Sequence, residues 1–226
     1  MSKAIITEGQ ARSIIGSFVV DTPWNEIQVD LQSFIQLTPQ ERGLRFAAFL
    51  RNGCRLNVGE PRIIRIDSGL KFNPAEFIGS GWATWKGPAD GDGLTGEEDL
   101  DKRSLALTEA DLTTAVFESG LKPGESSING EEKLKRLRAF GNVQFGGNVF
   151  LALWLDYQQN KENSSLEWIW RNRKISWMSF FGLVLRGPDG FRDVLCFYRN
   201  DDEWYWGYVW LGRGWDADGL SAGLAS

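Results

Sequence analysis

The chain has 226 residues, of which 42% are hydrophobic and 24% charged, proportions typical of a folded globular protein. Its net charge of −5 and pI near 5.0 argue against an electrostatic nucleic-acid binder, which needs clustered Lys and Arg. Histidine is absent, which excludes Ser-His-Asp and Cys-His catalysis and removes the commonest metal ligand.

Residues 1–60 are expected to form a partly helical N-terminal extension. The stretch TPQERGLRFAAFLRNG, residues 38–53, begins with a Thr cap and Pro and ends at Gly53, which predicts a helix. The N-terminus has no apolar signal-peptide core or cleavage pattern, and no window approaches 18 uninterrupted apolar residues. We therefore expect a protein made in the cytoplasm without a membrane span, and leave open whether it is exported.

The next segments predict short strands joined by ordered loops. RIIRID, residues 62–67, is typical of a strand, and residues 72–88 have the Gly and Pro content of an ordered loop containing one strand. The acidic tract at residues 89–103 is expected to be a flexible surface loop. Its acids suggest a calcium site, but Leu94 stands at a ligand position of the EF-hand pattern and the glycine is misplaced.

Three helices are predicted in the middle of the chain. LTEADLTTAVFESG, residues 107–120, has Thr108 and Asp111 as a capping-box-like pair. Residues 130–141 carry acids in the first turn and bases in the last, and the run from Lys133 to Arg138 is interpreted as a solvated helix face. Residues 147–160 have apolar side chains at helical spacing and are predicted to be buried.

From Ser164 onward the period changes to two, which predicts strands. They fall at residues 165–172, 174–187, 191–199 and 203–212, with a tight turn from Pro188 to Gly190. Segregation of helices from antiparallel strands predicts an α+β fold with helices packed on a mostly antiparallel sheet.

Few residues suggest chemistry. Cys54 and Cys196 are expected to be free thiols in a reducing compartment, with a single bridge as the alternative. The acid pairs Asp201 with Glu203 and Asp216 with Asp218 suggest a two-carboxylate hydrolase, although a chain with 30 acids contains many such pairs by chance. GSGW, residues 79–82, lacks the strand-to-helix setting of a dinucleotide loop. No catalytic residue, cofactor or metal ligand is predicted.

The run RNDDEWYWGYVWLGRGWDADGL, residues 199–220, holds four of the eleven tryptophans. Small, charged and aromatic residues lie between the indoles. One interpretation makes these tryptophans a core edge strand packed on the helix that carries Trp154. The other makes them the fixed frame of a binding surface, because indoles bring large apolar area.

The residues between the tryptophans use a restricted vocabulary. An AAC codon randomised at its two adenines can give Asn, Asp, Tyr, Gly, Val, Arg, Ala or Leu, but never Lys, Glu, Gln, Met or Trp. Among the residues between the tryptophans only Glu203 lies outside the reachable set, whereas a surface segment of this length ordinarily contains several Lys, Glu and Gln. The Trp codon has no adenine and a Leu codon needs none, so Trp and Leu211 would form an unchanging frame.

Residues 183–226, which include LRGPDGFRDVLCFYRNDDEWYWGYVWLGRGWDADGLSAGLAS, resemble the C-terminal variable region of diversity-generating-retroelement variable proteins of the nanoarchaeal and related candidate-phyla type. LTEADL and GEEKLKRL are also similar to this family. The resemblance implies a C-type lectin-like domain at residues 61–226 with a variable region at about 196–220. The GFR-like ending of phage members and the Glu-Pro-Asn and Trp-Asn-Asp calcium signatures are missing, so calcium-dependent sugar binding is not implied.

Carried over by position, the resemblance implies two sets of residues. The variable, ligand-binding positions are Arg199, Asn200, Asp201, Asp202, Tyr205, Gly207, Tyr208, Val209, Gly212, Arg213, Gly214, Asp216, Ala217, Asp218, Gly219 and Leu220. The scaffold positions are Trp204, Trp206, Trp210, Leu211 and Trp215. Cys196 is a further candidate for a variable position.

The resulting hypothesis is a non-enzymatic binding protein, favoured as a monomer, whose diversified C-terminal surface recognises a protein or other macromolecule. Residues of this surface suit such a role, since Tyr, Asp, Asn, Arg and Gly are typical of adaptable binding loops. A carbohydrate-binding module that uses exposed aromatic rings is the alternative, and a two-carboxylate hydrolase is a third hypothesis.

Overall fold

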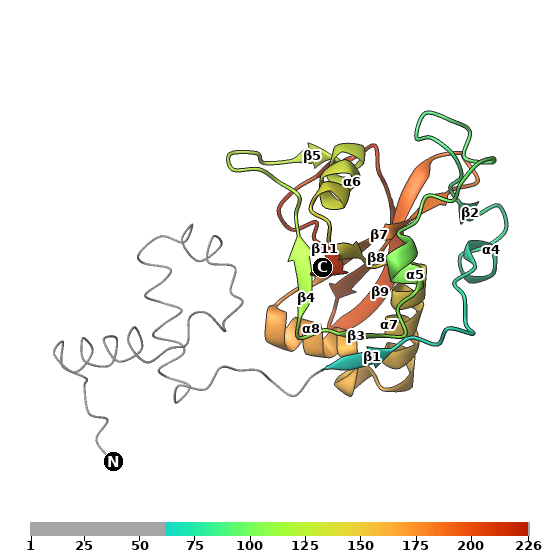
Figure 1. Ribbon diagram of the computed structural model, residues 1–226. Coiled ribbons are helices and arrows are strands. Elements are labelled where there is room, and N and C mark those ends of the chain that lie inside the picture. Colours follow the sequence, from blue (N-terminus) through green and yellow to red (C-terminus); the bar gives the residue numbers. More distant parts are fainter. Residues whose placement is uncertain (1–61, 226) are drawn as a thin grey trace, which may run out of the picture. The chain divides into compact units, whose positions relative to one another are not determined.

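The computed structural model describes residues 62–225 of the chain (Figure 1). The predicted N-terminal extension, with its predicted helix at residues 38–53, and Cys54 lie outside the described residues. The described part contains the whole of the predicted variable region, residues 196–220.

A seven-stranded, mostly antiparallel sheet forms the centre of the described domain. Its main path runs in the order β4 (Ala115–Glu118), β11 (Ser221–Leu224), β7 (Trp177–Arg186), β8 (Arg192–Asn200) and β9 (Glu203–Trp210). Two short strands lie off this path: β2 (Ala83–Thr84) pairs with β7, and β6 (Val143–Gln144) pairs with β11. The pairing of β11 with β7 is parallel, and the other pairings in this sheet are antiparallel. The predicted α+β class with a mostly antiparallel sheet is confirmed.

Helices cover both faces of this sheet (Figure 1). On one face, here called the helical face, lie α7 (Gly147–Gln159) and α8 (Ser165–Arg173), joined by the 3-10 turn η1 (Lys161–Asn163). On the opposite face, here called the α6 face, lies α6 (Gly130–Ala139). The helices predicted at residues 130–141 and 147–160 are confirmed.

Each face has its own buried core. Phe150 of α7 stacks on Phe197 of β8 with ring centroids 4.4 Å apart on the helical face. Leu137 of α6 is fully buried with Phe181 and Val194 on the α6 face. Successive side chains of β7 and β8 point to opposite faces of the sheet, and each face is covered by a core. Most residues of these two strands are therefore apolar.

Smaller elements surround the sheet. They are β1 (Ile63–Arg65), which pairs with β3 (Glu109–Asp111), β5 (Ile128–Asn129), which pairs with β10 (Gly214–Trp215), and the single-turn helices α4 (Pro74–Phe77) and α5 (Lys102–Leu105). The strands predicted at residues 62–67 and within 72–88 are confirmed by β1 and β2, whereas α4 was not predicted.

The helix predicted at residues 107–120 is wrong: this segment forms β3 and β4. Asp111 does not cap a helix. Its Oδ1 accepts hydrogen bonds from the backbone nitrogen and the hydroxyl of Thr113, at 2.9 and 2.7 Å, and so closes the turn between the strands. Pairing with β1 and β11 supplies the backbone partners, so tertiary contacts override a weak capping pattern.

The strand predicted at residues 165–172 is also wrong, because this segment forms α8. Ser164 is the N-cap, and its hydroxyl accepts a hydrogen bond from the Glu167 nitrogen at 3.2 Å. Leu166 and Ile169, three residues apart, are buried on one side. The sequence SSLE already contains this capping pattern, but the neighbouring aromatic residues suggested a strand.

The strands predicted at residues 174–187, 191–199 and 203–212 are confirmed by β7, β8 and β9, and so is the turn at Pro188–Gly190. In that turn the Gly190 nitrogen donates to the Gly187 oxygen at 2.9 Å. The register of β7 shifts between Phe180 and Leu185, at the place where Gly182 approaches the Gln144 backbone too closely for any side chain.

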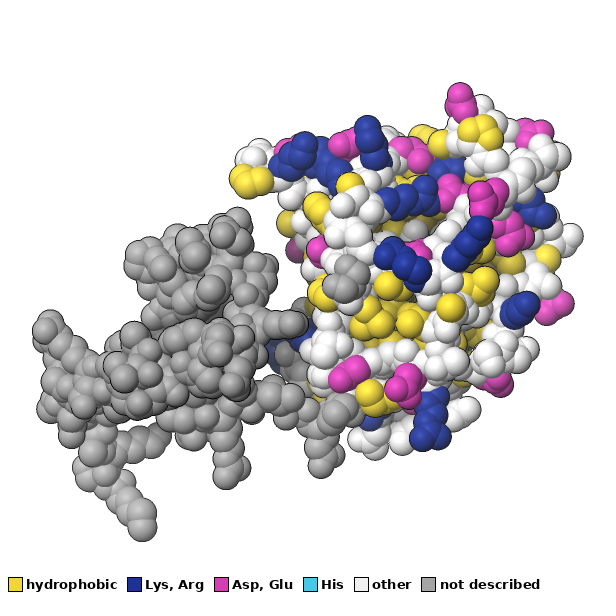
Figure 2. All heavy atoms as spheres, viewed as in Figure 1, with side chains coloured by type: hydrophobic (Ala, Val, Ile, Leu, Met, Phe, Trp, Pro, Cys, Tyr) yellow, Lys and Arg dark blue, Asp and Glu magenta, His cyan; other side chains and the backbone are white. Residues whose placement is uncertain are grey.

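The surface mixes both signs of charge. Figure 2 shows Lys and Arg side chains interspersed with Asp and Glu over the upper part of the visible face. The run from Lys133 to Arg138 is not a fully solvated face as predicted, because Lys133 is completely buried. Among the described residues, no helix is both long and apolar enough to cross a bilayer.

Candidate functional site

The β8–β9 hairpin sets the geometry of the C-terminal surface, defined as the exposed side chains of residues 199–220. Asn200 pairs with Glu203, so Asp201 and Asp202 alone form the turn. Both have positive φ, 45° and 65°, which is the conformation of a type I′ turn and suits the twist of a hairpin. Asp, Asn and Gly are the residues that accept it most readily.

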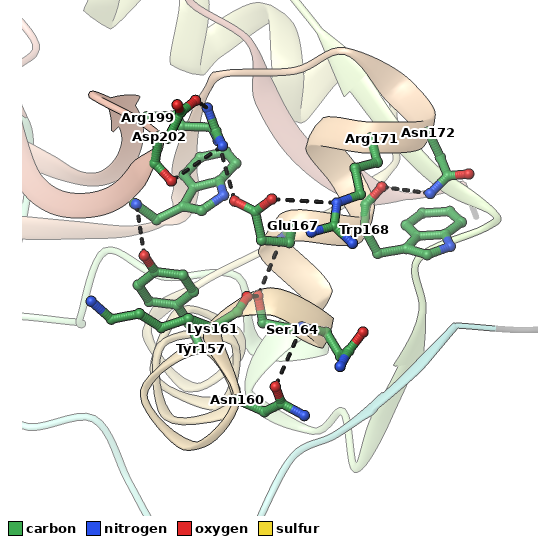
Figure 3. A network of polar contacts seen from close by, with 12 residues as sticks. Tyr157, Asn160, Lys161, Ser164, Glu167, Trp168, Arg171, Asn172, Arg199 and Asp202 are labelled. Atoms are coloured by element: carbon green, nitrogen blue, oxygen red, sulfur yellow. Dashed lines mark hydrogen bonds and ion pairs between the residues drawn. The ribbon is translucent and has the colours of Figure 1, made fainter.

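Arg199 anchors this turn to the helical layer (Figure 3). Its Nε donates to Glu167 of α8 at 3.2 Å, and its Nη1 to Asp202 at 2.9 Å. The guanidinium carbon lies 5.0 Å from the centre of the Trp170 ring. Only 12% of the Arg199 side chain is exposed, so this predicted ligand-binding residue is committed to holding the hairpin in place.

A second contact protects the same edge of the sheet. β9 is the last strand on the sheet path, and the backbone nitrogen of Trp204 donates to the Tyr157 hydroxyl of α7 at 3.0 Å (Figure 3). Lys161 pairs with Glu203 at 2.7 Å beside it. The start of β9 is therefore tied to α7 and η1, which leaves the rest of the strand as the open edge.

The predicted scaffold residues do not behave alike. Trp204 and Trp215 are 2% and 3% exposed and Leu211 is fully buried, as a frame requires. Trp206 is half-buried, with its ring 4.8 Å from that of Phe77. Trp210 is 48% exposed, unlike the buried members of this set.

The interpretation of the tryptophans as a core edge strand on the helix of Trp154 is correct only in part. Trp204 joins the same buried cluster as α7, against which Trp154 packs. Trp215 belongs instead to the core of the α6 face, with its ring 5.0 Å from Phe181. The four indoles therefore serve two faces of the sheet.

Of the predicted variable positions, Val209 alone is buried, at 6% exposed, and it belongs to the core of the α6 face. The others reach the surface at least in part. Exposed positions are Asn200, Asp201, Asp202, Tyr205, Tyr208, Arg213, Gly214, Asp216, Ala217 and Asp218, and half-buried ones are Arg199, Gly207, Gly212, Gly219 and Leu220. Cys196, the further candidate, is a buried free thiol whose pKa burial raises to about 12.

β9 divides these positions between two faces, because neighbouring side chains of a strand point in opposite directions. Tyr205 lies opposite Tyr198 on the α6 face, and Tyr208 lies opposite Leu195 on the helical face. The predicted surface is therefore not one patch.

On the α6 face three aromatic rings form a row across three strands. Trp177 lies opposite Tyr198 and Tyr198 opposite Tyr205, and each neighbouring pair stacks with centroids 5.7 Å apart. Sequence reasoning missed Trp177 and Tyr198. The pairing of Tyr198 with Tyr205 follows from a two-residue turn at Asp201–Asp202, so the strand pattern around that turn was the signal that could have found it.

On the helical face a second aromatic group surrounds the far end of β9. The Trp82 and Tyr208 rings lie 4.2 Å apart, and those of Phe191 and Trp210 lie 5.4 Å apart. Tyr208 is 50% exposed and Phe191 53%. Trp82 and Phe191 were not predicted as site residues, because they lie far from residues 199–220 in sequence.

The loop after β9 is held from beneath by Lys133. Its ammonium group donates to the Gly219 oxygen and lies 4.9 Å from the centre of the Trp215 ring. Burial lowers the pKa of Lys133 to about 7, although Asp216 and Glu118 partly oppose this. Asp216 closes the loop by accepting from the Asp218 and Gly219 nitrogens, both at 3.2 Å.

The acid pairs expected for a hydrolase have other roles. Asp216 and Asp218 form the turn just described, and a hydrogen bond from Lys161 lowers the pKa of Glu203. Asp193 of β8 belongs to neither pair. Its pKa is raised to about 6, mainly by burial and secondly by the negative charge of Asp189.

The acidic tract at residues 89–103 lines a cleft of about 1050 Å³ beside α6. The buried Arg192 bonds Glu131 at 2.7 Å and Asp99 at 2.9 Å there, and its guanidinium lies 4.8 Å from the Trp85 ring centre. Each of the cleft's carboxylates forms an ion pair. Hydrogen bonds hold the tract in place; for example, Arg186 Nε donates to the backbone oxygen of Asp92 at 2.7 Å.

Within residues 62–225 no group of three or more His, Cys, Asp or Glu side chains is placed to hold a metal ion. Comparison with known proteins adds no assignment: no family model matches the chain, and neither a curated protein nor a solved structure matches it significantly.

Proposed function

We propose that this chain is a non-enzymatic ligand-binding protein whose C-terminal surface is diversified to recognise a protein or other macromolecule. The observation that carries the proposal is the burial pattern of residues 199–220. Trp204, Leu211 and Trp215 are buried, while every predicted variable position except Val209 reaches the surface. A frame of buried side chains beneath exposed and varied ones is what a diversified surface requires.

Energetics support this division of roles. Each buried indole contributes roughly 1.5 to 3 kcal/mol or more through removal of apolar area from water. Exposed positions such as Tyr205, Arg213 and Ala217 make no comparable contribution, and substitutions at exposed sites usually change stability by about 0.5 kcal/mol or less. Diversity at the exposed positions would therefore leave the domain folded.

A C-type lectin-like fold of the diversity-generating-retroelement type is the second part of the proposal. It rests on the resemblance of residues 183–226 and on the restricted residue vocabulary of residues 199–220. A mostly antiparallel sheet with helices packed on it is compatible with that fold.

The structure narrows the positions at which diversity is expected. Val209 is a core residue, and Gly212 lies directly against the Trp210 ring, where a Cβ atom would clash. Asp201 and Asp202 need positive φ, which favours Asp, Asn and Gly. Free variation is therefore expected mainly at Tyr205, Tyr208, Arg213, Asp216, Ala217 and Asp218.

Sequencing this gene from several isolates tests the proposal. We expect substitutions to concentrate at the exposed positions of residues 199–220 and to spare Trp204, Leu211 and Trp215. A nearby template repeat and reverse-transcriptase gene would support it further. Variation spread evenly along the chain would contradict the proposal.

A carbohydrate-binding module remains a second candidate because of the aromatic row Trp177–Tyr198–Tyr205. The rings are stacked with centroids 5.7 Å apart, so each ring covers a face of its neighbour. Tyr205 is the last ring of the row, lies on the edge strand β9 and is 40% exposed, so its ring can contact a sugar. A glycan array with the wild type and the Tyr205→Ala and Tyr208→Ala variants tests this role. Binding that Tyr205→Ala abolishes would support it, and no binding by any of the three proteins would reject it.

A further inference from the structure

Asp193 of β8 is a buried carboxylate among exposed aromatic rings. On the helical face it lies directly opposite Trp210, and Tyr208 is the next residue of β9 on the same face. Phe191 is two residues before it in the chain and contacts Trp210. Aromatic side chains from both strands thus flank one acidic group.

A further aromatic residue, Trp82, lies near Asp193 beside the Gly187 backbone. A Cβ atom on Gly187 would stand 2.6 Å from Asp189 Oδ1, 3.4 Å from Asp193 Oδ2 and 3.5 Å from Trp82 Cη2. Both carboxylates and the edge of the Trp82 ring therefore lie close to the Gly187 backbone. Trp82 in turn contacts Tyr208, which connects the rings around the acid.

The Asp193 carboxylate has no partner among the described residues. The residue is 5% exposed, and no described donor forms a hydrogen bond or ion pair with its side chain. Asp189 in the β7–β8 turn adds a second negative charge nearby, and its Oδ1 accepts from the Phe191 nitrogen at 3.1 Å. Buried carboxylates are normally paired, so this group is poised to accept a cation.

Two arginines close to Asp193 in the fold, Arg186 of β7 and Arg192 of β8, do not supply that cation. Arg186 donates through Nε to the Asp92 oxygen at 2.7 Å and through Nη1 to the Gly187 oxygen at 3.3 Å, both backbone carbonyls. Arg192, next in the chain, points to the opposite face of the sheet, where it pairs with Glu131. The negative charge of Asp193 is therefore available to a ligand.

The rings are also available. Tyr208 is 50% exposed, Trp210 48% and Phe191 53%, an unusual concentration of large apolar surface on one end of two strands. Indole and phenol faces attract cations through their quadrupole, most strongly where the cation is partly desolvated. An aromatic group around an unpaired carboxylate combines both attractions for a positively charged ligand group.

We propose that Asp193, Trp82, Tyr208 and Trp210 form a binding site for an organic cation, an alkylated ammonium group or the ammonium end of a lysine side chain. This goes beyond the proposed function, because it depends on the side chains this chain carries and not on whether they vary. Trp82 and Asp193 lie outside residues 199–220, so the acid and one ring would stay fixed, while Tyr208 could tune the fit.

The site predicts a pH dependence of cation binding. Burial raises the pKa of Asp193 to about 6, so the carboxylate is charged above that pH and loses its charge below it. Asp189 in the β7–β8 turn, Arg186 of β7 and Tyr208 of β9 are the other titratable groups on the elements next to it. Affinity should therefore fall about tenfold from pH 8 to pH 5.

Titration of the full chain with choline, followed by tryptophan fluorescence and indole NMR shifts at constant ionic strength, tests the proposal. The matched control ligand is 3,3-dimethyl-1-butanol, which has the same shape without the charge. We expect choline to bind with a Kd on the order of millimolar and the neutral analogue to bind at least about tenfold more weakly. A butylammonium titration distinguishes a lysine-like ligand from a quaternary ammonium. Equal binding of choline and its neutral analogue would overturn the proposal.

Variants locate the site. Asp193→Asn keeps the shape and removes the charge, and we expect about tenfold weaker choline binding at pH 8 and no pH dependence between 5 and 8. Tyr208→Ala should weaken binding severalfold, whereas Tyr205→Ala, which removes another exposed Tyr of β9 on the opposite face, should not. Thermal unfolding confirms that each variant is folded. Unchanged binding in Asp193→Asn, or equal losses in both Tyr variants, would reject the site even if the C-terminal surface proves to be diversified.

Discussion

Asp193 carries an unfavourable charge at neutral pH. Its folded-state pKa is about 6, against an ordinary value of 3.8, because burial and the nearby Asp189 disfavour the carboxylate. The folded state therefore binds a proton more tightly than the unfolded state does, and its stability falls as pH rises from about 4 to 6. The difference corresponds to about 2 to 3 kcal/mol.

The Asp193→Asn variant should recover this free energy. We expect its free energy of unfolding to exceed that of the wild type by about 2 kcal/mol at pH 7, and the difference to disappear at about pH 4. Urea denaturation at both pH values measures it. A variant less stable than the wild type at pH 7 would show that the carboxylate is paired after all.

Lys133 titrates in the opposite sense. Burial lowers its pKa to about 7 from 10.5, so the unfolded state binds more protons between these values, and stability rises with pH across that range. From pH 7 to 8.5 we expect the wild type to gain up to about 1 to 2 kcal/mol from this group. Lys133→Met should remove the rise and also lose the hydrogen bond to Gly219. A wild-type stability that is flat over this range would contradict the prediction.

At the scale of elements, the β8–β9 turn stores backbone strain. Asp201 has φ 45°, a left-handed conformation that costs an L-residue roughly 1 kcal/mol relative to glycine. Asp201→Gly should therefore stabilise the hairpin by about 0.5 to 1 kcal/mol in thermal unfolding. Asp202→Gly is the comparison, because it relieves a similar φ but loses the charged bond from the mostly buried Arg199. Asp201→Gly loses only an exposed bond from Asn200 Nδ2, so the gain from Asp202→Gly should be smaller. Equal gains would show that the Arg199 contact is unimportant.

β9 also predicts which diversified positions tolerate polar side chains. Val209→Asp would place a charge in the core of the α6 face and should destabilise the domain by about 3 kcal/mol or more. Tyr205→Asp, four residues earlier on the same face but exposed, should cost less than about 1 kcal/mol. Chemical denaturation of both variants measures the contrast, and similar losses would refute the burial pattern on which the proposed function rests.

Element prediction succeeded where side-chain period and burial agreed. The helices α6 and α7 follow their apolar periods, and β7, β8 and β9 are rich in the aromatic and branched residues that favour strands, so these predictions hold. It failed at residues 107–120 and 165–172. In the first segment, sheet partners distant in sequence decided the conformation. In the second, Trp168 and Trp170 have side chains suited to strands, but they are half-buried and pack against the core from a helix.

At the scale of the whole molecule, a buried ion pair connects the hairpin with the helical layer. Arg199 and Glu167 have side chains that are 12% and 8% exposed, and Glu167 also lies near Arg171 (Figure 3). Removal of one partner leaves the other buried charge with only its second, more exposed partner, Asp202 for Arg199 and Arg171 for Glu167, so Glu167→Gln and Arg199→Met should each cost about 2 kcal/mol. The double variant should cost less than the sum, with a coupling of about 1 kcal/mol or more. Strictly additive losses would show that the two layers are held together independently of this pair.

The sequence by itself determined the class of fold, the main strands of the C-terminal half and the restricted vocabulary of residues 199–220, because these depend on local period and composition. Tertiary structure alone decided which face each of those residues occupies. It made Trp210 a surface residue and Val209 a core residue, and it brought Trp82 and Asp193 to Tyr208. Burial and juxtaposition depend on strand register and on loops far apart in the chain, and no local pattern encodes them.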